Sequence, residues 1–172
     1  MRKNPERVAW AILLAAFFVC VGLAVGIPWG ARTYLVSAQK SHDVSVERQW
    51  GTLRITPAGR GESIVIAETR NDILERTTIA TENAQGRLVM HAPQSDNSTV
   101  ASVQLYEKTQ VTLISSSSPR FSLSKLPHQT TLEVKTGNVR INVTDTAIRS
   151  TMAKVLTPQG IVSLAEGSYV IE

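Results

Sequence analysis

The sequence predicts an all-β domain preceded by one N-terminal transmembrane α-helix. Three observations support this fold class. The first is an uninterrupted apolar run near the N-terminus, and the second is a change to alternating polar and apolar residues after residue 43. The third is a series of short strand-like segments separated by Gly, Pro, Asn and Ser. We expect an antiparallel sandwich or a short β-solenoid of many short strands.

The apolar run extends from Val8 to Trp29 and contains no charged or strongly polar residue. A helix needs roughly 20 apolar residues, each rising about 1.5 Å, to cross a hydrocarbon core about 30 Å thick. The run meets this length, so it predicts a single-pass span. The chain is then divided into a cytoplasmic tail (1–7), a transmembrane helix (8–29), a connector (30–42) and a β domain (43–172).

The charges beside the span predict its orientation. Arg2, Lys3 and Arg7 lie in the short N-terminal tail, whereas Arg32 and Lys40 are the basic residues that follow the span most closely. By the positive-inside rule, the tail is cytoplasmic and the β domain is extracytoplasmic, at the inner or plasma membrane.

Aromatic residues at both ends of the run are typical of membrane interfaces. Trp10 lies near one end, and Trp29 and Tyr34 lie near the other. With the three basic residues of the tail they are the expected interface anchors. Within the run, Gly22 and Gly26 form a small-xxx-small pair, which is a candidate surface for packing a second helix. Scattered small residues in a lipid-exposed span are the alternative.

A cleaved secretory signal is the alternative to an anchor. Basic residues followed by an apolar core fit a signal, and Val36-Ser37-Ala38 offers the small residues that a signal peptidase prefers. However, the core exceeds the 7–15 residues or so that are usual in signals. The cleavage point would also lie beyond Arg32 and Tyr34. We therefore favour an uncleaved anchor.

The region after the span is punctuated like a set of short strands. Gly51, the Pro57–Gly61 segment and Gly86 mark turns, and the run Ser115–Ser118 is expected to be a flexible loop. The segments around Asn83–Gly86 are expected to form a hairpin. The expected strands cover 44–50, 52–55, 63–67, 73–74, 77–80, 87–90, 100–105, 110–114, 121–123, 131–135, 138–143, 152–156, 161–164 and 168–171.

A faint internal repeat involves strands that flank a glycine. Val44-x-Val46 leads through Gly51 to Leu53-Arg54-Ile55, and Leu132-x-Val134 leads through Gly137 to Val139-Arg140-Ile141. A looser third copy surrounds Gly160. Either these are true repeats, or they are alike because all strand–turn–strand units resemble one another.

The charge distribution argues against nucleic acid as a partner. The formal net charge is +4, but beyond Trp29 there are 15 Lys and Arg against 13 Asp and Glu, with the signs interspersed. No basic run suited to adjacent phosphates is present. The expected partners are the lipid bilayer and another envelope or membrane protein, contacted through sheet edges or the span.

No residue pattern indicates catalysis, a cofactor or a metal. His42, His91 and His128 are far apart in sequence and are expected to be solvated in loops or at strand ends. Serine is plentiful, but no nucleophile motif with a base is present. The single cysteine, Cys20, lies inside the span, where it acts as a small apolar residue. We predict no catalytic, cofactor-binding or metal-binding residues.

The β region resembles the FecR-like domain of bacterial envelope proteins. The resemblance lies in Val65–Ile66 through Leu88–Met90, in the step Gly137–Ile141, and in the closing stretch from Val155-Leu156-Thr157-Pro158 to Ser168-Tyr169-Val170. It covers residues 44–172. It implies a domain that continues past Glu172, with a C-terminal edge left for a partner to cover.

The best-known members of that family pass a periplasmic signal to a sigma factor through an N-terminal cytoplasmic domain. Residues 1–7 are too short for such a domain, so the resemblance does not carry the sigma-factor role to this chain. The sequence therefore predicts a non-catalytic, single-pass binding or sensory β module of the cell envelope. A structural or adhesive surface-interaction protein is the alternative.

Overall fold

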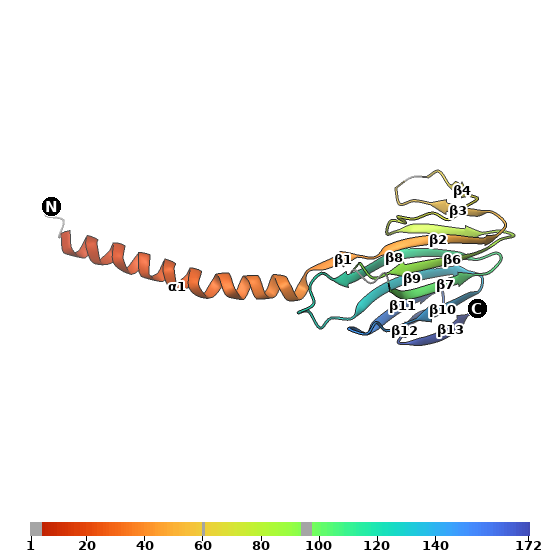
Figure 1. Cartoon of the computed structure of the whole chain (residues 1–172). Coiled ribbons are helices and arrows are strands. Elements are labelled where there is room, and N and C mark those ends of the chain that lie inside the picture. Colours follow the sequence, from red (N-terminus) through yellow and green to blue (C-terminus); the bar gives the residue numbers. More distant parts are fainter. Residues whose placement is uncertain (1–4, 60, 94–97) are drawn as a thin grey trace.

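The computed structural model describes residues 5–59, 61–93 and 98–172, and it comprises one long helix followed by a β domain (Figure 1). The all-β prediction for the region after the helix is confirmed. Arg2 and Lys3, which are expected to be interface anchors, lie outside the described residues.

Helix α1 runs from Pro5 to Ser37 and extends away from the β domain (Figure 1). It includes the predicted span and most of the predicted connector, so the helix continues past Pro28 to the edge of the domain. At about 1.5 Å per residue, its 33 residues are longer than a hydrocarbon core. The side chains of its apolar window are not buried against any other part of the protein. α1 is therefore long and apolar enough to cross a membrane.

The larger of two sheets contains eight strands in the order β12-β11-β9-β8-β5-β3-β4, and β1 pairs with the end of β8. Its pairs are antiparallel except for β9 and β11, which are parallel. The strands are β1 (Gln39–Ser41), β3 (Leu53–Thr56), β4 (Ile64–Ile66), β5 (Thr77–Thr81), β8 (Gln110–Pro119), β9 (His128–Thr136), β11 (Thr151–Thr157) and β12 (Gly160–Leu164).

The smaller sheet contains five strands in the order β13-β10-β7-β6-β2, and all of its pairs are antiparallel. Its strands are β2 (Asp43–Trp50), β6 (Gln85–His91), β7 (Thr99–Leu105), β10 (Val139–Val143) and β13 (Gly167–Ile171). The predicted segments 73–74 and 121–123 are not strands.

One apolar core is shared by both sheets. Period-two alternation places every second side chain of strands such as β10 in this core, as the buried positions of Val139, Ile141 and Val143 illustrate. Leu53 and Ile79 come from the larger sheet and are fully buried. Branched aliphatic residues and Leu dominate the core, as the composition of the strands predicts.

Two glycines lie at corners where the chain changes sheets. Gly51 leads from β2 to β3, and Gly137 leads from β9 to β10. Both have positive φ, at 75° and 85°. A Cβ on Gly51 would lie 2.6 Å from the Cβ of Ala84, and one on Gly137 would lie 2.6 Å from the carbonyl oxygen of Lys108. Glycine is therefore required at both corners by conformation and by space.

The three glycine-flanked units of the sequence are not equivalent. The units at Gly51 and Gly137 are corners between sheets, whereas the unit at Gly160 is a hairpin within one sheet, because β11 pairs with β12. The resemblance of the first two therefore reflects a shared turn between layers. The third shares only the strand–turn–strand pattern.

The predicted hairpin around Asn83–Gly86 is wrong. β5 pairs with β3 and β8 in the larger sheet, whereas β6 pairs with β2 and β7 in the smaller one. The connection between β5 and β6 is another crossing between layers. Ala84 is fully buried there, where it lies close to Gly51. The two crossings therefore pack against each other.

Candidate functional site at the helix–domain junction

The site lies where the chain passes from α1 into the two sheets. β1 follows the helix directly and pairs with Ser117–Pro119 of β8 in the larger sheet. β2 then joins the smaller sheet, so His42 is the residue at which the chain crosses between layers. The backbone N–H of His42 donates to the carbonyl of Ser116 at 3.0 Å, which fixes this crossing.

Two histidines and two serines form a buried polar group, which we call the histidine–serine cluster (His42, Ser116, Ser118 and His128). His42 Nδ1 lies 2.6 Å from Ser116 Oγ, and His42 Nε2 lies 3.1 Å from Ser118 Oγ. Ser118 Oγ is also hydrogen-bonded to His128 Nδ1. The two imidazole centroids are 5.6 Å apart.

The cluster continues through threonines at both ends. Ser116 Oγ lies 3.2 Å from Thr130 Oγ1, and His128 Nε2 lies 3.3 Å from Thr146 Oγ1. Within the described residues, no buried side-chain nitrogen or oxygen lacks a hydrogen-bond partner. Because a buried polar group is costly without partners, this complete pairing allows two imidazoles inside a β core.

Both histidines are held in the neutral form. Burial, followed by the nearby His128, lowers the pKa of His42 from 6.5 to about 4. Burial also lowers the pKa of His128, the charge of Arg149 lowers it further, and the carboxylate of Asp145 partly opposes both effects. Transferring a charge out of water is unfavourable, so at neutral pH the cluster is an uncharged network of hydroxyl and imidazole groups.

The structure corrects two predictions about this region. His42 and His128 are not solvated loop residues, because their exposed fractions are 6% and 4% and their rings are neighbours. The serine run 115–118 is not a flexible loop, because it is the second half of β8. Ser116 and Ser118 alternate into the interior, and this stretch carries no apolar signal because hydroxyls replace aliphatic side chains there.

A loop of residues 120–127, here called the junction loop, joins the cluster to the helix. The backbone N–H of Arg120 donates to the carbonyl of Ala38 at 2.9 Å, and Ser124 Oγ donates to the carbonyl of Val36 at 2.7 Å. The rings of Tyr34 and Phe121 meet edge-on with centroids 6.0 Å apart. The last turn of α1 is thus attached to the β domain by main-chain and side-chain contacts.

Arg149 binds the backbone of the junction loop and of the preceding residue. Its guanidinium donates to the carbonyls of Pro119, Phe121 and Ser124 at 3.4, 3.3 and 2.9 Å. Its backbone N–H donates to Thr146 Oγ1 at 3.2 Å, and Thr146 in turn contacts His128. A continuous set of hydrogen bonds therefore connects the histidine–serine cluster, Arg149 and the end of α1.

A surface pocket of about 440 Å³ opens beside the cluster. The residues that line it include His42 and Ser116 and the acidic residues Asp43, Asp72 and Glu75. Glu75 Oε1 accepts a hydrogen bond from the backbone N–H of Ser116 at 3.2 Å. A group that occupied this pocket would therefore contact residues of the cluster directly.

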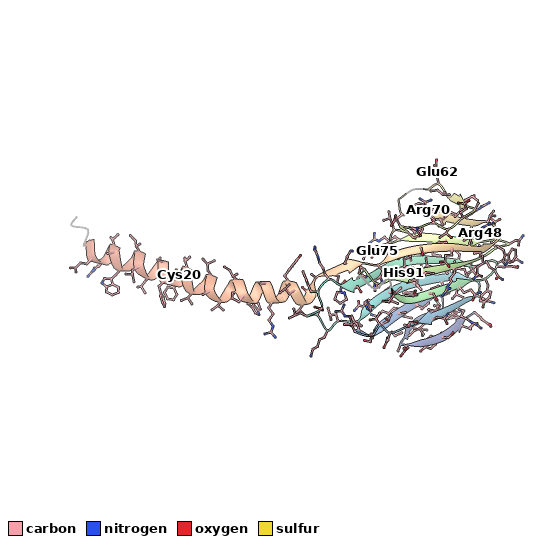
Figure 2. The ribbon with its side chains drawn as sticks, viewed as in Figure 1. Cys20, Arg48, Glu62, Arg70, Glu75 and His91 are labelled. Atoms are coloured by element: carbon pink, nitrogen blue, oxygen red, sulfur yellow. The ribbon has the colours of Figure 1, made fainter. Side chains whose placement is uncertain are left out.

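The predicted membrane residues lie along α1, away from the cluster. Trp10 and Trp29 are exposed, and a Cβ on Gly22 or Gly26 would meet no other atom within 4 Å. Figure 2 shows Cys20 on the part of the helix that is remote from the β domain. Tyr34 is the exception, because its ring contacts Phe121 of the junction loop.

The described residues contain no group of three or more His, Cys, Asp or Glu side chains placed to hold a metal. Ser118 lies between two imidazoles, as a nucleophile lies beside a base, but its exposed fraction is 2% and its hydroxyl faces the interior. The geometry therefore suits a structural or switching network better than nucleophilic attack.

Comparison of the chain with known family models, with curated proteins and with solved structures gave no match.

Proposed function

We propose that this chain is a single-pass, membrane-anchored binding or sensory β module of the cell envelope that acts without catalysis. The observation that carries the proposal is α1, which is apolar, exposed along its apolar window and joined without a break to the β domain. Exposed apolar surface of this extent is unfavourable in water, and a hydrocarbon core removes it from water. The lipid bilayer is thus the first partner.

The proposed orientation places residues 1–7 in the cytoplasm and the β domain outside it. It is supported by the positive-inside rule, since Arg2, Lys3 and Arg7 precede the span. Trp10 and Trp29 would lie at the two membrane interfaces. The Tyr34–Phe121 contact would then lie just outside the membrane, between the span and the domain.

We also propose that the domain is a FecR-like antiparallel sandwich and not a solenoid. Among the strand pairs of the described residues, the parallel β9–β11 pair is the exception, whereas a solenoid is built from parallel pairs. The segment Val65–Met90, the step Gly137–Ile141 and the C-terminal strand pattern are the residues that carry the FecR-like resemblance.

A sensory role is supported by the hydrogen bonds between the domain interior and the helix end. A ligand in the pocket beside His42 would contact Ser116, and the network leads from there through His128, Thr146 and Arg149 to the junction loop. Such a network is a physical connection between the pocket and the helix end. It couples the two only if the network has two conformations and a ligand binds one of them more tightly.

The anchor is tested by alkaline carbonate extraction of membranes that contain the tagged full-length chain. An anchored chain stays in the membrane pellet, and mass spectrometry shows that it retains residues 1–7. A soluble species beginning near Gln39 would contradict the anchor, because it would show that residues before that point are removed.

The sensory role is tested by substitutions on the span. Gly22→Leu and Gly26→Leu should abolish the response of a partner in the membrane, whereas Ala24→Leu, which keeps both glycines, is the matched control. Binding by the β domain itself should be unchanged in all three variants. An unchanged response in the glycine variants would contradict signalling through this helix surface.

The second candidate is a structural or adhesive surface-interaction protein. It is favoured by the exposed apolar side chains of the outer strand β12, where Ile161 and Val162 are 70% and 45% exposed. Replacing α1 with an unrelated membrane helix discriminates the two. A surface module keeps its full function on a foreign anchor, whereas a sensor keeps its ligand binding and loses its response.

A further inference from the structure

Two open strands, joined by residues 165–166, form the C-terminal end of the domain. β12 is the outermost strand of the larger sheet, and β13 is the outermost strand of the smaller one (Figure 1, blue). Each has five residues and is paired along one side, to β11 and to β10 respectively. Neither strand contains a charged residue or a proline.

Other outer strands of the domain are protected in the usual ways. The free side of β2 is covered, because Val46 and Arg70 exchange backbone hydrogen bonds at 2.8 and 2.9 Å and Ile73 donates to Val44 at 2.9 Å. β4 is short, with three residues. Proteins normally cover, shorten or charge such edges to prevent pairing with other chains. β12 and β13 show none of these devices, which marks them as a pairing surface.

The strand directions decide which partner strand fits each edge. β1 and β2 both lead away from α1. The pairings of the larger sheet, followed from β1, show that β12 runs toward the helix end. The pairings of the smaller sheet, followed from β2, show that β13 runs away from the helix end. The two open strands therefore have opposite directions. Figure 1 shows that the strands of the domain run roughly along the direction of α1.

We propose that the occupant of this surface is a second copy of the same chain, anchored in the same membrane. A two-fold axis parallel to the strands, and hence to the membrane normal, keeps both helices pointing into one bilayer. It places β12 beside β13 of the partner subunit, in antiparallel orientation, and β13 beside β12 of the partner subunit. Both layers are then continued across the interface.

The side chains fit this arrangement without a register slip. Because a two-residue link joins β12 to β13, Ile161 lies opposite Val170 of the partner subunit and Val162 lies opposite Tyr169 of the partner subunit. Ile161 and Val170 both face outward and are 70% and 54% exposed, whereas Tyr169 packs against the core. Val162 pairs with the buried Val155 and is still 45% exposed.

Outward residues therefore meet outward residues, and inward residues meet inward residues. A shift by one residue would place apolar inward side chains on the outer face of the joined sheets. The partially exposed Val162 and Tyr169 would become enclosed by the continued core. The same alternation that builds the monomer is thus preserved across the interface.

The other two-fold arrangement is excluded by the membrane. An axis perpendicular to the sheets would pair β12 with β12 of the partner subunit, and it would point the two α1 helices in opposite directions. The inference rests on the proposed anchor at this step. A topology assay of the anchor is separate from the experiment below, so failure of one can be distinguished from failure of the other.

The experiment is disulfide cross-linking between two differently tagged full-length chains in membranes. One chain carries Ile161→Cys and the other Val170→Cys, both in a Cys20→Ser background to remove the native thiol. We expect a cross-linked species that carries both tags. Leu123→Cys, an exposed residue of the junction loop, replaces Ile161→Cys in the matched control and should give no cross-link above background.

Three further outcomes are decisive. Adding Val162→Lys to both chains should reduce the 161–170 cross-link to the control level, with far-UV circular dichroism showing that the domain remains folded. Absence of the 161–170 cross-link in the original pair would overturn the proposal. Self-cross-linking of a chain that carries Ile161→Cys alone would overturn it as well, because that product requires β12 to lie beside its own copy.

Discussion

Acidification should destabilise the β domain through His42. The imidazole has a pKa of 6.5 when free in an unfolded chain, and burial beside His128 lowers this pKa to about 4 in the folded protein. Between these pH values the unfolded state binds a proton that the folded state does not. Stability is therefore fully present above pH 6.5 or so, and it falls as the pH decreases toward about 4.

The size of the effect follows from the two pKa values. One pH unit corresponds to about 1.4 kcal/mol, so the loss from His42 reaches about 2 kcal/mol at about pH 5 and about 3 kcal/mol below about pH 4. His128 adds to the loss, because its pKa is also lowered. This is a large share of the 5–15 kcal/mol or so that is typical of domain stability.

The assay is guanidinium unfolding of the full-length chain in non-ionic detergent, followed by the β-sheet circular dichroism signal at neutral and acidic pH. His42→Gln is the matched control, because its amide can bond Ser116 and Ser118 but does not titrate. The variant should show about 2 kcal/mol less pH dependence than the wild type at about pH 5. Equal pH dependence in the two proteins would refute the assignment of His42 as a buried neutral imidazole.

Two other predictions concern Arg149 and the corner glycines. Arg149→Gln should raise the pKa of His128, because the variant removes a nearby positive charge. NMR titration of the His128 imidazole measures this shift. An unchanged pKa would contradict an electrostatic effect of Arg149 on His128. Gly137→Ala should lower the free energy of unfolding by about 2–5 kcal/mol, because the new methyl group would meet Thr109 in a left-handed conformation. Gly59 also has a positive φ, but a Cβ there would meet no other atom within 4 Å. Gly59→Ala should therefore lower the free energy of unfolding, measured by thermal unfolding, by about 1–2 kcal/mol. Equal losses of stability in the Gly137 and Gly59 variants would refute the steric argument.

The strands with strict alternation were predictable from the sequence. Val139–Val143 alternates between buried and half-buried or exposed positions as the pattern requires, and so does Leu53–Ile55 on β3. These segments carry their own signal, because each places apolar side chains on one face. The pairing partners and the assignment to two sheets depend on contacts distant in sequence, which the pattern does not contain.

The candidate site was not predictable in the same way. His42 and Ser116 are 74 positions apart, and the site exists because β1 and β8 become neighbours. The serines gave the appearance of a loop, although they are interior residues whose partners are imidazoles. A period-two pattern of hydroxyls at Ser116 and Ser118, read together with two unassigned histidines, is the signal that could have indicated it.

The expected hairpin at Asn83–Gly86 failed for a related reason. Turn residues indicate that the chain reverses, but they do not show whether the next strand stays in the same sheet. Here the reversal crosses to the other layer, because Ala84 is buried against Gly51 at the neighbouring crossing. Close packing between two turns decided the topology, and no local feature of the sequence encodes that contact.

The central claim is that α1 anchors the β domain outside the cytoplasm. It is tested most directly by protease digestion of the tagged full-length chain in cells whose outer barrier has been opened and in inverted membrane vesicles. An extracytoplasmic β domain is digested in the opened cells and protected in the inverted vesicles, and the undigested chain retains residues 1–7 by mass spectrometry. Protection from outside, with digestion in the inverted vesicles, would place the domain in the cytoplasm and contradict the account.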